Sequence, residues 1–64
     1  MNINDCVLLK IDLVNEGLKK GMQGVVVAIF DKPEIAYEVE FCDDQGKTIE
    51  VVALKPEHLE KIDA

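Results

Sequence analysis

The sequence predicts an all-β domain in which about five short strands close into a small, strongly bent barrel. In residues 35–41, IAYEVEF, apolar and polar side chains alternate with a period of two, as in a strand with one buried face. Turn-forming residues separate this segment from three other short apolar runs. A chain of 64 residues is too short for a sandwich of two large sheets, whereas a small barrel also removes exposed strand edges.

The first two strands are expected in residues 5–11, DCVLLKI, and 23–30, QGVVVAIF. A polar segment, DLVNEGLKKG, joins them, and its glycines are expected to adopt positive φ. Three consecutive valines favour extended backbone in the second strand. Both of its faces are apolar, so the strand is either covered on both sides or strongly bent. Pro33 ends it, because proline cannot donate a hydrogen bond to the neighbouring strand.

The third and fourth strands are predicted to form a hairpin around the turn DDQG, residues 43–46. This turn suits a type I conformation in which Gly46 is left-handed and forms a bulge. The expected register places Phe41 opposite Ile49, Val39 opposite Val51 and Tyr37 opposite Ala53, so that every inner pair is apolar. The same register places Glu50 directly across from Glu40.

The C-terminal segment LKPEHLEKI is expected to contain one short 3₁₀ turn at residues 56–59. A closing strand is expected in residues 60–62.

These elements follow the plan of an SH3-like barrel. The segments GLKKGMQGVVV, AYEVEF, DDQGKTIEVVAL and LKPEHL resemble the shared pattern of a family of small bacterial proteins of unknown function. The pattern has a G-x-x-G-x-V start, a Y-E-V-E-F strand, an acidic-glycine turn and a terminal leucine, and it covers nearly the whole chain. The resemblance implies the fold and no activity. More distantly, the G-x-x-G-x-V element is similar to that of KOW-type ribosomal and transcription-factor modules, which implies nucleic-acid or translation-associated binding.

Composition indicates one acidic domain, residues 1–64. The formal net charge is -6, with 13 acidic residues against seven lysines and no arginine. Proteins that bind nucleic-acid backbones usually carry a basic stripe, so the charge argues against that class. An acidic surface favours basic partners. No signal peptide or membrane-spanning run is visible, and the two cysteines do not suggest a disulfide scaffold, so we expect a cytoplasmic protein with reduced thiols.

The stretch KKGMQG has two interpretations. Lys19 and Lys20 beside two glycines could hold an anion, as in phosphate-binding loops. However, a strand rather than a helix follows Gly24, and neither the Walker nor the Rossmann spacing is present. A structural turn is therefore favoured over an anion site.

Soft ligands and nucleophiles do not form a recognisable motif. Cys6, Cys42 and His58 lack the paired spacing of zinc ligands, and a structural zinc site normally needs four ligands. We expect no metal, no cofactor and no catalytic residue, so the chain is not expected to be an enzyme.

Five carboxylates are expected to cluster on one hairpin: Glu38, Glu40, Asp43, Asp44 and Glu50. This cluster has three interpretations: a solvated face, a docking surface for a basic partner, or a calcium or magnesium site. The third fits least well, because the carboxylates lack the D-x-D-x-D spacing of a cation-binding loop. We expect a protein-interaction or regulatory module that contacts a basic protein through this face. One version is an immunity or antitoxin protein that masks a basic nuclease groove. The alternative is a KOW-like nucleic-acid-binding module.

Several apolar side chains are expected on the outside of so small a barrel. Either the long loop in residues 12–20 covers them or a second copy of the chain does, which would make a homodimer.

Overall fold

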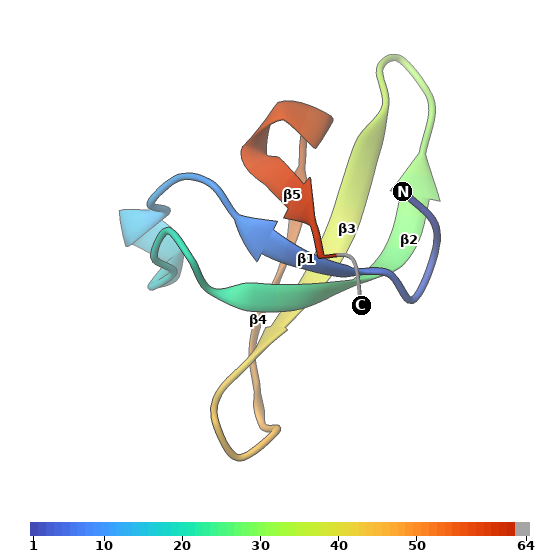
Figure 1. Ribbon diagram of the computed structural model, residues 1–64. Helices are drawn as coiled ribbons and strands as arrows, with labels where there is room; N and C mark the ends of the chain where they lie inside the picture. Colours follow the sequence, from blue (N-terminus) through green and yellow to red (C-terminus); the bar gives the residue numbers. More distant parts are fainter. Residues whose placement is uncertain (63–64) are drawn as a thin grey trace.

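The computed structural model describes residues 1–62 and confirms the all-β prediction (Figure 1). Its elements are β1 (Cys6–Leu9), η1 (Val14–Glu16), β2 (Gln23–Phe30), β3 (Ala36–Cys42), β4 (Thr48–Leu54), η2 (Pro56–His58) and β5 (Leu59–Lys61). All strand pairs are antiparallel. Of the two 3₁₀ turns, η2 matches the expected turn near the C-terminus. The turn η1, within the long loop, was not predicted.

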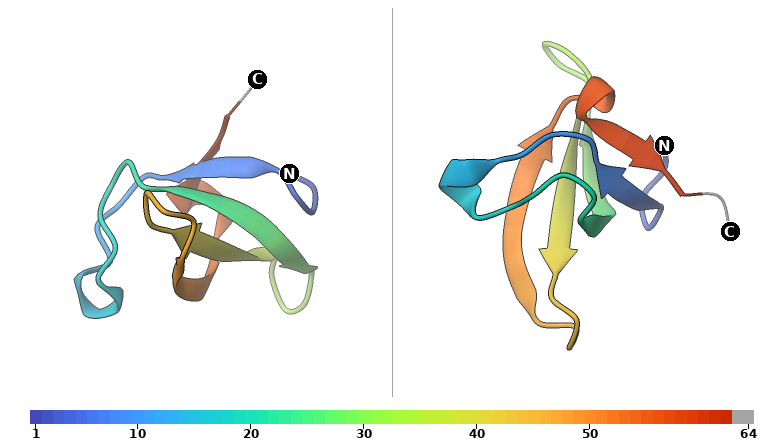
Figure 2. Two further views of the ribbon diagram at one scale, coloured as in Figure 1. Left: turned by 90° about the horizontal axis from the view of Figure 1, so that it is seen from below. Right: turned by 60° about the vertical axis from the view of Figure 1, so that its left-hand side comes forward.

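The five strands form one sheet in the order β4-β3-β2-β1-β5. The first residues of β2 pair with β1, whereas β3 follows β2 along most of its length. A bulge between Val26 and Ala28 shifts the register of β2 against β3, and bulges of this kind bend a strand. Figure 2 shows β2 curving from the β1 side of the molecule to the β3 side. Val26 of β2 is fully buried, whereas Val27, Ile29 and Phe30 remain 39%, 40% and 46% exposed, so the bend does not cover both faces of this strand.

The core lies inside this bend and consists entirely of apolar and aromatic side chains. The buried residues are Val7, Leu9, Leu18, Val26, Tyr37, Val39, Phe41, Leu54 and Leu59. Leu18 comes from the long loop, which is held by a bridge between Leu13 and Leu18. The loop therefore supplies a core residue, while Val14 on the same loop is 83% exposed.

The expected register between β3 and β4 is wrong over most of its length. Cys42 pairs with Thr48, as the turn geometry predicts, but a bulge follows. From there Phe41 pairs with Glu50, Val39 with Val52 and Tyr37 with Leu54. The one-residue shift buries Leu54 and most of Val52, and it leaves Ile49 and Val51 about 40% exposed. The longer Leu54 side chain thus fills the core position that the prediction gave to Ala53.

The hairpin turn itself has the expected conformation. Gly46 has a φ of 79°, in the left-handed region, and its N–H donates to the Asp43 carbonyl at 3.0 Å. The N–H of Asp43 donates in turn to the Lys47 carbonyl at 2.9 Å. Glycine is favoured at this position because a Cβ would be strained there.

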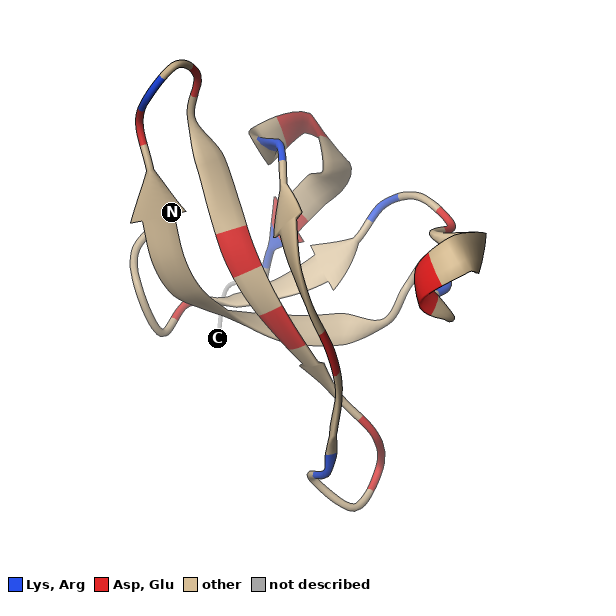
Figure 3. Cartoon of the chain, turned by 180° about the vertical axis from the view of Figure 1, so that it is seen from behind, with Lys and Arg blue, Asp and Glu red and all other residues tan. Residues whose placement is uncertain are grey.

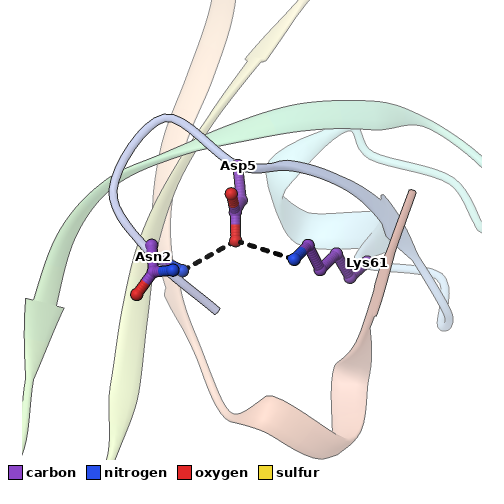
Figure 4. A network of polar contacts seen from close by, with 3 residues as sticks. All are labelled: Asn2, Asp5 and Lys61. Carbon is purple, nitrogen blue, oxygen red and sulfur yellow. Dashed lines mark hydrogen bonds and ion pairs between the residues drawn. The ribbon is translucent and has the colours of Figure 1, made fainter. Parts of the chain in front are cut away.

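A polar network holds the N-terminal residues against β5 (Figure 4). One Asp5 carboxylate oxygen accepts a hydrogen bond of 2.7 Å from the Asn2 N–H. The same oxygen lies 3.8 Å from Lys61 Nζ. The Asp5 carbonyl accepts a hydrogen bond from the Val26 N–H at 3.0 Å, so this turn also contacts β2.

The described residues include no helix long and apolar enough to cross a membrane.

Candidate functional site

Two glutamates of β3 lie on its outer face, away from the core. In β3 the buried residues Tyr37, Val39 and Phe41 alternate with half-buried Glu38 and Glu40. Strand residues alternate between faces, so both carboxylates project from the side of the sheet opposite the core. Figure 3 shows the two glutamate positions as consecutive red bands along β3. The predicted acidic face therefore exists on this strand.

Apolar residues flank both glutamates. Glu40 pairs with Val25 of β2 and Val51 of β4. Glu38 pairs with Ala28 of β2 and Ala53 of β4. Directly opposite residues in an antiparallel pair share a face. We call these six residues the acidic outer face: a row of two carboxylates between two rows of small apolar side chains.

Glu50 does not belong to the acidic outer face, contrary to the predicted register. Because of the bulge in β4, Glu50 pairs with Phe41, whose side chain is on the core side. Glu50 stays exposed because it lies near the turn end of the hairpin. Its Oε1 accepts a hydrogen bond of 3.1 Å from the N–H of Val51, the next residue along β4. Glu50 and Glu40 are therefore not cross-strand neighbours.

The two turn aspartates have different surroundings. Asp43 Oδ1 accepts hydrogen bonds from the N–H groups of Gln45 and Lys47, both at 2.9 Å. Its carboxylate therefore organises the turn. Asp44 is exposed, and its side chain makes no hydrogen bond with another residue of the range 1–62. Asp44 is thus the freer of the two to contact a partner.

An open groove of about 600 Å³ connects the turn with the start of β2. Its acidic lining comes from Glu40, Asp43 and Asp44. Its apolar lining includes Met22, Val25 and Ile49, and Cys42 also lines it. The groove brings the glycine segment GMQG and the acidic hairpin, which are separate in the sequence, to one place. A lining that combines apolar side chains with carboxylates suits a lysine or arginine side chain, whose stem is apolar and whose end is charged.

The carboxylates of this region have no cationic partner in residues 1–62. The two ion pairs there join Lys55 to Glu34, beside the start of β3, and Lys61 to Asp5, and neither involves a carboxylate of this region. Cys42 Sγ lies 3.8 Å from Glu40 Oε1, which is a weak contact. Glu38 and Glu40 are thus half-buried negative charges that no lysine of the described chain neutralises.

Lys19 and Lys20 lie in the loop before β2, and the backbone there is already hydrogen-bonded. The N–H of Lys20 donates to Asp12 Oδ1 at 2.8 Å, and the N–H of Gly21 donates to the Leu9 carbonyl at 2.8 Å. The N–H of Met22 donates to the Lys19 carbonyl at 3.1 Å. An anion site of the phosphate-loop type needs converging free N–H groups. The anion site stays a prediction, and the groups that could bind an anion there are the exposed side chains of Lys19 and Lys20.

The three soft ligands lie in different parts of the fold. Cys6 is exposed on β1, Cys42 is half-buried on β3, and His58 ends η2. Among residues 1–62, no three histidine, cysteine, aspartate or glutamate side chains are grouped so that they could hold a metal ion.

Sequence reasoning missed the contribution of Met22, Cys42 and Ile49 to the groove. The turn sequence predicts that Cys42 and Thr48 are paired, which places residue 49 close to Cys42. No sequence signal indicates that the start of β2 lies beside them, because that contact depends on the pairing of β2 with β3.

Comparison with protein families identifies one match. A family model described as a domain of unknown function (DUF4926) matches residues 3–61. No curated protein and no solved structure matches the chain. Since the family model covers almost the entire sequence, the chain belongs to the DUF4926 family.

Proposed function

We propose that this protein is a non-enzymatic interaction module that binds a basic partner protein through the acidic outer face and the adjoining groove. The observation that carries the proposal is the half-buried pair Glu38 and Glu40, flanked by apolar side chains and without a lysine partner in the described chain. A purely solvating acidic surface would place its charges at fully exposed positions. A carboxylate between apolar rows instead matches a cationic side chain that brings its own apolar stem.

The architecture supports the assignment to SH3-like barrels within this proposal. The strand order β4-β3-β2-β1-β5, a long loop between β1 and β2, and a 3₁₀ turn before the last strand are the features expected of that fold. We further propose that the protein works in the cytoplasm, where its two free cysteines stay reduced.

An immunity- or antitoxin-like role is one form of the proposal. A nuclease has a basic substrate groove, and an acidic face that binds there would block it. Inhibition of a basic nuclease would require a face with carboxylates and little competing positive charge. The groove lining contains three carboxylates and no lysine, although Lys20 directly precedes the lining residue Gly21 and Lys47 lies at the hairpin turn.

Binding to poly-L-lysine at low ionic strength tests whether this face is a specific acidic surface. The test variant is Glu38→Gln, Glu40→Gln and Asp44→Asn together. The control variant is Glu16→Gln, Glu57→Gln and Glu60→Gln, which changes the net charge equally on exposed residues of η1, η2 and β5. We expect the test variant to bind at least about tenfold more weakly, equivalent to about 1.4 kcal/mol.

The control variant should remain within about twofold of the wild type, a change of less than about 0.5 kcal/mol. Equal losses in both variants would mean that only net charge matters, and the proposal would be wrong. A parallel titration with RNA tests the KOW-like alternative. Salt-sensitive RNA binding that requires Lys19 and Lys20 would favour that class instead.

A further inference from the structure

The strand β4 forms an edge of the sheet that is open to another strand. Within the described part of the chain, β3 is the only strand that pairs with β4. β4 is seven residues long, and its sequence TIEVVAL has one charged residue, no proline and no lysine. Natural edge strands are usually short or protected by such residues, because an unprotected edge pairs with other chains. The bulge of β4 lies at its beginning, and pairing is regular from Glu50 to Leu54.

The backbone groups that face outward belong to Val51 and Ala53. The N–H of Val51 donates to the Glu50 carboxylate rather than to β3. Along an antiparallel strand, successive residues direct their N–H and C=O groups to opposite sides. Glu50, Val52 and Leu54 therefore hydrogen-bond to β3, and Val51 and Ala53 present their groups at the edge. The Glu50 side chain covers one of these groups.

We propose that the β4 edge binds an extended, lysine- or arginine-rich segment of a partner protein as an added antiparallel strand. This inference rests on the proposed function, since it specifies how the basic partner is held. Strand addition supplies main-chain hydrogen bonds, and the side chains on either face select the partner.

The charges on both faces of the edge select basic side chains. A new strand would lie about 4.8 Å beyond β4 and about 10 Å from β3. On the outer face, a lysine or arginine stem could cross the small Ala53 or Val51 side chain and bring its charge to Glu38 or Glu40. On the other face, the incoming strand takes over the Val51 N–H and releases the Glu50 carboxylate. That carboxylate then needs a cation beside it.

The same charges disfavour a second copy of this chain at the edge. Each copy carries a formal net charge of -6. Two β4 strands paired around a two-fold axis would place both Glu50 carboxylates on one face and bring the two acidic outer faces together. Like charges close together across strands are destabilising.

The probe for this proposal is a nine-residue peptide of alternating lysine and valine with blocked ends. Hydrogen exchange of the ¹⁵N-labelled protein reports backbone pairing. We expect the peptide to protect the amides of Val51 and Ala53, whereas Glu50 and Val52 are already paired with β3. The same peptide methylated on its backbone nitrogens keeps its charge but cannot donate to a strand edge, and should bind at least about tenfold more weakly.

The matched protein variant is Val51→Pro, which removes the outward N–H without changing the charge. Proline is tolerated on an edge strand when its nitrogen faces outward. We expect Val51→Pro to bind the peptide at least about tenfold more weakly, while its amide spectrum retains the dispersion of the folded wild type. If this variant does not fold, binding of the methylated peptide to the wild-type protein still tests whether main-chain hydrogen bonds are required.

Three outcomes would overturn the proposal. In the first, Val51→Pro and methylation of the peptide backbone leave binding unchanged, while the triple variant of Glu38, Glu40 and Asp44 abolishes it. The partner would then bind by charge alone, and the proposed function would survive without strand addition. If neither the peptide nor poly-L-lysine binds, both proposals are wrong. If the Val51 and Ala53 amides are protected without peptide in a concentration-dependent dimer, the edge belongs to a second copy.

Discussion

Gly24 of β2 lies so close to Val39 of β3 that a Cβ on Gly24 would be 2.6 Å from Val39 Cγ1. The same Cβ would be 2.9 Å from Phe41 Cδ1 and 3.0 Å from the Glu40 carbonyl oxygen. Gly24 is buried and its φ is not positive, so the requirement for glycine here is one of space and not of backbone conformation. The absence of a side chain lets β2 and β3 approach beneath the acidic outer face.

We predict that Gly24→Ala destabilises the fold by about 1–3 kcal/mol, because overpacking forces core side chains and backbone to move. For a domain of this size, each kcal/mol lowers the melting temperature by about 4–8 °C. Thermal or urea unfolding measures the change. Ala53→Val serves as the control, since it adds methyl groups at an exposed position of β4 and should stay within about 0.5 kcal/mol. A Gly24→Ala variant as stable as the wild type would contradict the close approach.

The register of β4 predicts different responses at two neighbouring valines. Val52 pairs with Val39 and packs against the core, whereas Val51 is 40% exposed. Val→Thr keeps the shape of the side chain but replaces a methyl group with a hydroxyl, which costs about 1–3 kcal/mol where it is buried without a partner. We therefore expect Val52→Thr to lower the free energy of unfolding by about 1–2 kcal/mol and Val51→Thr to change it by less than about 0.5 kcal/mol. The opposite order in urea unfolding would support the register in which Val51 faces Val39.

The hairpin turn depends on the carboxylate of Asp43. We expect Asp43→Ala to destabilise the protein by about 1 kcal/mol, because the N–H groups of Gln45 and Lys47 lose their acceptor. Asp43→Asn retains the oxygen and should recover most of this loss. Amide hydrogen exchange at Gln45 and Lys47 checks the location of the effect. Asp44→Ala is the neighbouring control, and a loss as large as that of Asp43→Ala would show that charge, not the turn, is responsible.

In the Asp5 network, we predict that the hydrogen bond from the Asn2 N–H contributes more to the free energy of unfolding than the ion pair with Lys61. We expect Asp5→Ala to cost about 1 kcal/mol, since the Asn2 N–H loses a charged acceptor at 2.7 Å. Lys61→Ala should cost less than about 0.5 kcal/mol, because the 3.8 Å pair is partly exposed and screened by water and salt. Unfolding of the two variants at low and at high salt separates the contributions. A Lys61→Ala loss as large as that of Asp5→Ala, abolished by high salt, would mean that the ion pair accounts for the whole contribution of Asp5 and would contradict this prediction.

The amino-acid pattern was sufficient for several parts of the structure. The alternation of residues 35–41 predicted the two faces of β3, and therefore the positions of Glu38 and Glu40. The turn DDQG predicted the left-handed Gly46 and the pairing nearest to it. Both features follow from local rules, since side chains alternate along a strand and glycine enters the left-handed region more readily than any other residue.

Tertiary packing alone decided the register of β4 and, with it, the membership of the acidic outer face. Residues 49–54 are apolar at every position except Glu50, so either face of this strand could turn inward. The bulge at Ile49 allows Leu54 and Val52 to face the core, and this choice moves Glu50 to the opposite side from Glu38 and Glu40. The sequence could not predict this result, because the free energy that selects it comes from filling the core between strands that are distant in the chain.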